Sequence, residues 1–134
     1  MTGQSDTGRV LIVDDDRVFR LALGKVLTKA GYTTVLAEDG EEAERLLAQQ
    51  PFDVMLVDLK MPKKDGLAVL RDALRLAPSL RAIMITAFGD IEVQNEAIRL
   101  GVFAYTNKPI RRDEVLDLVR RAMGGRSSVA APTR

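Results

Sequence analysis

Cysteine, histidine and tryptophan are absent from the 134 residues of this sequence. The lack of cysteine excludes disulfide bonds, thiolate metal sites and thiol nucleophiles, and it fits a reducing compartment. The lack of histidine excludes Ser-His-Asp catalysis, zinc sites built on imidazole, and any phosphohistidine carried on this chain. These absences exclude several common classes of catalytic and metal-binding site.

Long apolar runs and a strong charge bias are also missing. No apolar run approaches the ~20 residues of a membrane span, and the N-terminal stretch MTGQSDTG lacks the apolar core of a secretion signal. The 20 basic and 19 acidic residues leave a net charge of +1, and no basic run marks a nucleic-acid-binding surface. We therefore expect a cytoplasmic protein that binds neither membranes nor nucleic acid through this chain.

The apolar residues follow two patterns that alternate along the chain: short continuous runs and helical spacing. They make up 46% of the sequence, enough for one domain that buries roughly 65–70% of its unfolded surface. Helical spacing predicts five helices, and a capping box of Asp39 and Glu42 opens the second. Short runs rich in β-branched residues predict strands at residues 10–13, 33–37, 54–57, 82–86 and 102–106. The predicted helices lie at residues 18–30, 39–47, 67–76, 90–100 and 112–123.

The predicted strands are apolar along their whole length, which is typical of a parallel sheet covered by helices on both faces. We therefore expect an α/β fold, a doubly wound sandwich around a five-stranded parallel sheet. The domain is expected to span residues 9–123, after a disordered N-terminal segment at residues 1–8. The small and polar residues at 124–134 predict a flexible tail or linker stub.

Reactive side chains end four of the five predicted strands. Asp14 and Asp15 follow the first strand, Asp58 follows the third, Thr86 ends the fourth, and Lys108 follows the fifth. Ligands of such sheets gather at the carboxyl ends of the strands, so these side chains are expected to share one rim. Three neighbouring carboxylates raise one another's pKa, and a hard cation with oxygen ligands relieves that conflict. Mg²⁺ together with Lys108 balances the three negative charges.

A plainer interpretation of these aspartates is a helix N-terminus, where acids accept hydrogen bonds from free amides. We expect this role for Asp16. For Asp14 and Asp15 taken alone, a structural role at the helix start and a functional site fit equally well. The additional acid at Asp58 and the lysine at Lys108, both at strand ends, favour a site.

Four motifs resemble the receiver domain of bacterial two-component response regulators. They are LIVDDD, VMLVDLKMPKKDG, MITAFG and YTNKPI, and the resemblance covers residues 9–123. It implies a flavodoxin-like (βα)₅ fold with strand order 2-1-3-4-5, which agrees with the predicted alternation of strands and helices. It also implies a signalling phosphoacceptor that catalyses only its own phosphorylation and dephosphorylation, rather than an enzyme with a separate substrate.

The resemblance assigns roles to the residues at the predicted rim. Asp58 matches the phosphoacceptor, which takes a phosphoryl group from a phosphohistidine. Asp14 and Asp15 match the acidic pair that binds Mg²⁺ together with Asp58, and the backbone carbonyl of Lys60 matches the remaining protein ligand. Lys108 matches the lysine that pairs with the phosphoryl group.

Further matched residues belong to the switch that phosphorylation operates. Thr86 matches the hydroxyl that turns toward the phosphoryl group, and Tyr105 matches the aromatic residue that changes position with it. Pro109 matches a proline that follows the lysine through a cis peptide bond. Phe88 has two interpretations: a loop aromatic that packs locally, or a shield that protects the acyl phosphate from water.

The implied partners lie outside this chain. Since the chain has no histidine, its phosphoryl donor is a histidine kinase, a phosphotransfer protein or a small phosphodonor. The switched surface is that of the fourth helix, fifth strand and fifth helix, which also suits a homodimer. The stretch from Met84 to Ile110 resembles receivers of the nitrogen-regulation type of sigma-54-dependent activators. The chain is therefore either free-standing or followed, after residue 124, by an output domain that controls transcription.

Two alternatives remain open at this point. Asp14 and Asp16 followed by Val18 resemble the nucleophile motif of haloacid-dehalogenase-type phosphatases, with Asp14 as nucleophile and Asp16 as acid-base. That assignment leaves Asp58 without a role. It also needs another acidic pair at a strand end after the lysine, where Asp113 and Glu114 instead open a helix. A receiver-like binding module that never carries phosphate is the other alternative, and no missing site residue supports it.

Overall fold

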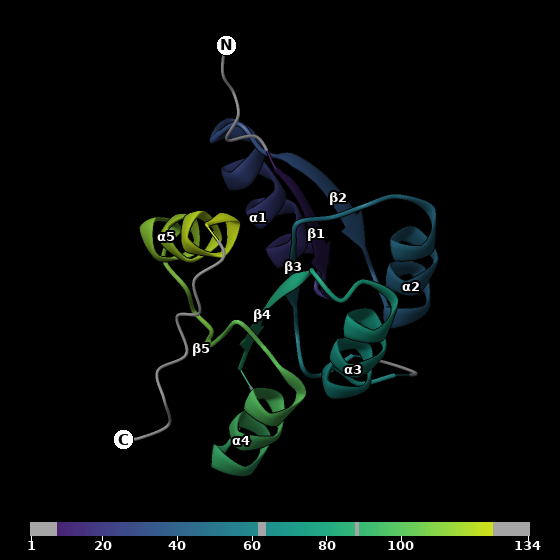
Figure 1. Cartoon of the computed structure of the whole chain (residues 1–134). Helices are drawn as coiled ribbons and strands as arrows, with labels where there is room; N and C mark the ends of the chain where they lie inside the picture. The colour runs from purple at the N-terminus through teal and green to yellow at the C-terminus, as the bar shows by residue number, and fades with distance from the viewer. Residues whose placement is uncertain (1–7, 62–63, 88, 125–134) are drawn as a thin grey trace.

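In the computed structural model, the described residues are 8–61, 64–87 and 89–124 (Figure 1). Five strands form one parallel sheet, in the order β2-β1-β3-β4-β5. The fold expected from the apolar pattern, and the strand order implied by the resemblance, are both confirmed. The strands are β1 (Arg9–Val13), β2 (Thr33–Ala37), β3 (Val54–Val57), β4 (Arg81–Thr86) and β5 (Ala104–Asn107).

Helices cover both faces of this sheet, as the buried, mainly apolar central strands β1, β3 and β4 require. On one face lie α2 (Gly40–Gln49), α3 (Gly66–Leu76) and α4 (Ile91–Leu100), and on the other lie α1 (Arg17–Lys29) and α5 (Arg112–Met123). Figure 1 shows α1 and α5 together on one side of the strands. No helix within the described residues is long and apolar enough to cross a membrane.

Successive residues of a strand point to opposite faces of the sheet, and they pack into two separate apolar cores, one under each helical layer. The central strands β1, β3 and β4 contribute residues to both cores, so they are buried on both faces. The first core contains Leu11, Val13, Met55, Val57 and Met84, and the second contains Val10, Ile12, Val54, Leu56 and Ile83. This burial fixes the sheet register, because a one-residue slip would move each side chain to the opposite core.

Aspartate caps open the first four helices. The predicted caps Asp16 and Asp39 are confirmed: Asp16 accepts a hydrogen bond from the Phe19 amide at 3.2 Å, and Asp39 accepts one from the Glu42 amide at 2.9 Å. These caps satisfy amides that have no partner within the helix. Asp65 and Asp90 play the same role for α3 and α4.

The fifth strand begins later than its apolar run predicts. It was expected from residue 102, but it spans Ala104–Asn107. Val102 instead completes the end of α4, where its amide donates to the Ala97 carbonyl at 3.0 Å. Gly101 makes this turn in the left-handed region, with φ of 103°. The helix end therefore uses a residue that the pattern assigned to the strand.

Candidate active site

The sheet register brings two of the predicted acids together. Val13 and Val57 are paired neighbours at the ends of β1 and β3, so the residues that follow them, Asp14 and Asp58, leave the sheet side by side. The Asp14 amide donates to the Ala37 carbonyl and the Asp58 amide donates to the Val13 carbonyl, both at 3.1 Å. The sheet's hydrogen bonds therefore fix the backbone beneath both acids.

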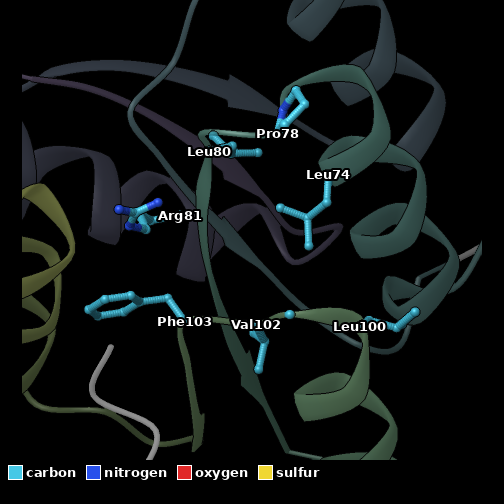
Figure 2. A pocket seen from close by; sticks show the side chains of 8 residues that line it. Leu74, Pro78, Leu80, Arg81, Leu100, Val102 and Phe103 are labelled. Carbon is cyan, nitrogen blue, oxygen red and sulfur yellow. The ribbon is translucent and has the colours of Figure 1, made fainter. Parts of the chain in front are cut away.

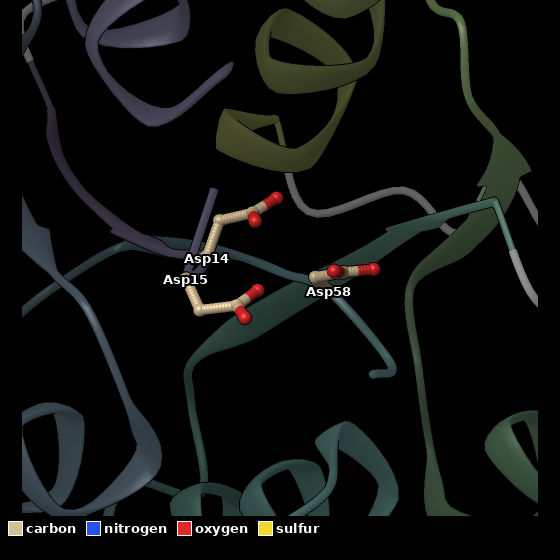
Figure 3. Close-up of side chains that lie close together, drawn as sticks. All are labelled: Asp14, Asp15 and Asp58. Atoms are coloured by element: carbon tan, nitrogen blue, oxygen red, sulfur yellow. The ribbon is translucent and has the colours of Figure 1, made fainter. Parts of the chain in front are cut away.

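Three carboxylates meet at this edge. One oxygen each from Asp14, Asp15 and Asp58 lie within 4.8 Å of one another. Figure 3 shows Asp14 and Asp15 at the end of β1 and Asp58 close to them. Asp14 and Asp58 are only 2% and 4% exposed, whereas Asp15 is exposed. The predicted acidic cluster is thus present, with two members buried and one open to solvent.

Burial dominates the electrostatics of Asp14. It raises the pKa of the Asp14 carboxyl, and the nearby charge of Asp58 raises it further. Hydrogen bonds from the Asp16 amide, at 2.9 Å, and from Lys108 act in the opposite direction without reversing the shift. The site therefore places a carboxylate where negative charge is costly unless a cation is near.

Lys108 supplies one such cation. Its Nζ lies 3.0 Å from Asp14 Oδ2 and 3.6 Å from Asp58 Oδ2. Its backbone amide donates to the Thr86 carbonyl at 2.9 Å, which ties the end of β5 to the end of β4. The peptide bond between Lys108 and Pro109 is cis, the geometry expected for it.

The donor set also fits a divalent cation. Within residues 8–61, 64–87 and 89–124, the buried oxygen Asp58 Oδ1 has no hydrogen-bond partner. Buried polar atoms are rarely left unpaired, so this oxygen points to a ligand. Three carboxylates with one exposed member form the all-oxygen, partly solvated set that Mg²⁺ prefers.

The loop after Asp58 returns to the sheet through a close backbone contact. The Gly66 amide donates to the Leu59 carbonyl at 2.6 Å, and a methyl group at Gly66 would lie 2.2 Å from the Asp58 carbonyl oxygen. Only glycine fits such a contact. Lys60, whose carbonyl is the expected metal ligand, lies in this loop with an exposed side chain.

The predicted switch residues lie at the same edge of the sheet. Thr86 ends β4 and is fully buried, next to Asn107 of β5. Tyr105 lies on β5, and burial raises the pKa of its hydroxyl, with the charge of Asp90 adding to the shift. Phe88, the expected shield, lies outside the described residues.

The geometry does not support Asp16 as an acid-base residue. Its side chain is the N-cap of α1, where Oδ1 accepts from the Phe19 amide. Asp113 lies in the first turn of α5, beyond β5, and is paired with Arg111 at 3.1 Å. The next acids after Lys108, Asp113 and Glu114, therefore lie in the first turn of α5 and not at the strand end that a haloacid-dehalogenase-type site requires.

Two residues that sequence reasoning missed also contact this site. The centre of the Phe19 ring lies 4.1 Å from Lys108 Nζ, and the Arg20 guanidinium donates to the Asp14 carbonyl at 2.6 Å. In the sequence, Phe19 is one of the apolar residues whose helical spacing predicts the helix at residues 18–30. Its separation from Lys108 along the chain leaves no local pattern that reveals the contact.

A hollow of about 420 Å³ lies at the other end of the sheet, where β4 begins. Figure 2 shows mainly apolar side chains around it, together with Arg81, the first residue of β4. It contains no acid and no predicted site residue, so the reactive side chains gather elsewhere. Its lining residues are Leu74, Pro78, Leu80, Arg81, Leu100, Gly101, Val102 and Phe103.

Comparisons with known proteins agree with this geometry. Residues 10–120 match the sequence model of the family described as the response regulator receiver domain. The DNA-binding transcriptional regulator NtrC of Escherichia coli is 40% identical over 116 residues, which are 87% of this chain and 25% of NtrC. Sporulation initiation phosphotransferase F of Bacillus subtilis is 33% identical over 113 residues, which are 84% of this chain and 91% of that protein.

Solved structures show the same fold. A CheY-like response regulator receiver domain protein from Methanospirillum hungatei superposes with a TM-score of 0.87 at 27% identity, covering 89% of this chain and 95% of that one. A response regulator from Burkholderia pseudomallei, solved with a phosphorylated aspartic acid, a calcium ion and citrate, gives 0.81 at 25% identity, covering 88% and 69%. The chain spans about a quarter of NtrC and most of these two structures. It belongs to the response regulator receiver family and is a receiver domain of the two-component signalling type.

Proposed function

We propose that Asp58 accepts a phosphoryl group from a partner's phosphohistidine and that Mg²⁺ is required for the transfer. The observation that carries this proposal is the buried Asp58 carboxylate, whose Oδ1 has no partner in the described part of the chain while Oδ2 lies 3.6 Å from Lys108 Nζ. A relative named a phosphotransferase and a structural neighbour solved with a phosphorylated aspartic acid support the same chemistry.

The transfer forms one bond and breaks another. A carboxylate oxygen of Asp58 attacks the phosphorus in line, the P–N bond to the donor imidazole breaks, and an acyl phosphate results. Mg²⁺, held by carboxylate oxygens of Asp14, Asp15 and Asp58 and the Lys60 carbonyl, would neutralise charge on the phosphoryl oxygens. Lys108 pairs with a further phosphoryl oxygen and is already placed between Asp14 and Asp58.

Phosphorylation then shifts the population of a switch. The new dianion attracts the Thr86 hydroxyl, and the space this leaves allows Tyr105 to change its position. Since Tyr105 lies on β5, next to α4 and α5, the surface of α4, β5 and α5 changes. Ile91, which is 66% exposed at the start of α4, belongs to this surface and suits an apolar partner or a second copy of the chain.

The wider context belongs to the same proposal. The donor is a histidine kinase or a phosphotransfer protein, and the chain acts in the cytoplasm, catalysing only its own phosphorylation and dephosphorylation. Residues 9–123 form the receiver, and an output domain after residue 124 controls transcription, as the similarity to NtrC suggests. Phe88 remains proposed as the residue that shields the acyl phosphate.

Intact mass spectrometry tests the central step. The chain is incubated with phosphoramidate or acetyl phosphate, with and without Mg²⁺, and compared with Asp58→Asn. The expected result is a gain of one phosphoryl group that requires Mg²⁺ and is lost in Asp58→Asn. A gain that persists in Asp58→Asn but disappears in Asp14→Asn would favour the phosphatase alternative instead. No gain in any condition would favour a phosphate-free module.

A further inference from the structure

The ammonium group of Lys108 lies close to an aromatic ring as well as to the two buried carboxylates. Its Nζ lies 4.1 Å from the centre of the Phe19 ring, 3.0 Å from Asp14 Oδ2 and 3.6 Å from Asp58 Oδ2. The Lys108 side chain is only 17% exposed. A cation over a ring face is attracted by the ring's quadrupole, and the attraction is stronger where water is excluded.

The start of α1 fixes the ring in this position. The Phe19 amide donates to the Asp16 cap, so the ring is anchored in the first turn after the acids. The Phe19 side chain packs against the core that α1 and α5 cover. The space that Phe19 shares with Asp14 and Asp58 is too small to hold a water molecule. The ring therefore shields one side of the ammonium while the acids pair with it.

We propose that Phe19 is a positioning residue for Lys108. A lysine has a flexible four-carbon stem and a compact ammonium, so ion pairs alone leave it considerable freedom. The ring removes that freedom before the reaction and keeps the cation where charge develops on the phosphoryl oxygens. An aliphatic side chain would fill the same core space but would offer no π face. The inference rests on the proposed function of Asp58.

Three variants separate positioning from packing. Phe19→Leu removes the ring, Phe19→Tyr keeps it, and Leu27→Val trims a fully buried residue of the same helix and core. The rate of phosphorylation by phosphoramidate at saturating Mg²⁺ is measured beside the midpoint of urea unfolding. Phe19→Leu is expected to slow the reaction about three- to tenfold. Phe19→Tyr and Leu27→Val are expected to react at the wild-type rate, although Leu27→Val is less stable.

Either of two rate results would overturn the proposal. One is a wild-type rate in Phe19→Leu. The other is a loss of rate in Leu27→Val as large as that in Phe19→Leu, because the effect would then follow stability rather than the ring.

A second readout does not depend on phosphorylation. In the wild type, the ring current of Phe19 is expected to shift the Lys108 Hε resonances upfield, and Lys108→Met identifies these signals by their disappearance. Phe19→Leu should abolish the shift while the other lysine signals stay in place. If the wild type takes up no phosphoryl group, the proposed function fails, but loss of this shift would still support the positioning. A Lys108 signal that Phe19→Leu leaves unmoved overturns it.

Discussion

The Tyr105 hydroxyl lies against the backbone of Gly89. A methyl group added to Gly89 would lie 1.4 Å from the hydroxyl oxygen and 3.2 Å from Cγ2 of Thr86. The Tyr105 hydroxyl is buried and has no hydrogen-bond partner among the residues that the structure describes. The loop after Thr86 therefore accommodates the tyrosine only because residue 89 has no side chain, and the position of Tyr105 is sensitive to this one residue.

Gly89→Ala is expected to push the Tyr105 ring out of its present position. The contact involves the free end of a side chain, which moves at low cost, so the loss of stability should stay within about 1 kcal/mol. The chain has two tyrosines, and 3-fluorotyrosine labelling therefore gives two ¹⁹F resonances. The Tyr105 resonance should move toward its solvent-exposed value while that of Tyr32 stays in place. Gly124→Ala, where the nearest atom would be 3.4 Å away, is the matched control and should move neither resonance.

Gly66→Ala is expected to have a much larger effect on stability. The added methyl would lie 2.2 Å from the Asp58 carbonyl oxygen and 2.6 Å from Leu59 Cα, and backbone atoms cannot rotate away. We expect a loss of about 2–3 kcal/mol in the free energy of unfolding, measured by urea denaturation. The added methyl group should also weaken Mg²⁺ binding, since it displaces the loop that carries Lys60. Equal stability of Gly66→Ala and wild type would contradict the close contact between Gly66 and the backbone of Asp58 and Leu59.

The sequence predicted the parts of this site that depend on backbone topology. Asp14 and Asp58 could be placed together because each directly follows a strand, and parallel strands end at one edge. The contacts of Phe19 with Lys108 and of Tyr105 with Gly89 could not be predicted in this way. They depend on the length and direction of side chains that project from different elements, which hydrophobic periodicity does not record.

The late start of β5 has a similar cause. Val102 has the β-branched, apolar character of a strand residue, but the left-handed Gly101 directs its amide to the end of α4. A local pattern cannot show which of two adjacent elements a residue joins when both would bury it. Element types were therefore predicted correctly, whereas this boundary was not.

Asp58→Ala is expected to stabilise the protein in the absence of divalent cations. The substitution removes a buried carboxylate whose Oδ1 has no partner among the described residues, and it relieves repulsion with Asp14. Lys108 keeps its closer partner, Asp14 Oδ2 at 3.0 Å. We expect a gain of about 1–2 kcal/mol in the free energy of unfolding.

Addition of Mg²⁺ should reverse this order, because a cation that binds only the folded state stabilises the wild type by mass action. Urea unfolding with EDTA and with millimolar Mg²⁺ measures both effects. Calcium, a hard cation of larger radius, serves as a second ligand in the same titration. If both ions changed the stability of wild type and Asp58→Ala equally, the result would contradict a metal site at these carboxylates.

Lys64 forms a network that links two helices to the loop before α3, and its contribution should depend on pH. Its Nζ pairs with Glu44 of α2 and Asp72 of α3. The hydrogen bond from Lys64 lowers the pKa of Asp72 below its usual 3.8, and bonds to Asp72 and Glu44 raise the pKa of Lys64 above its usual 10.5. These shifts mean that the folded state favours the charged form of both partners.

The stability that Asp72 adds is therefore fully present above pH 3.8 and is lost as the pH falls through its lowered folded pKa. The stability that Lys64 adds is fully present below pH 10.5 and is lost as the pH rises through its raised folded pKa. Lys64→Met should cost about 0.5–1 kcal/mol near neutral pH, since the pair is partly exposed. The difference from wild type should stay constant from pH 5 to about 9 and shrink below pH 3.8. Lys25→Met, at an exposed lysine of α1, is the control, and an equal cost there would mean that the network contributes nothing specific.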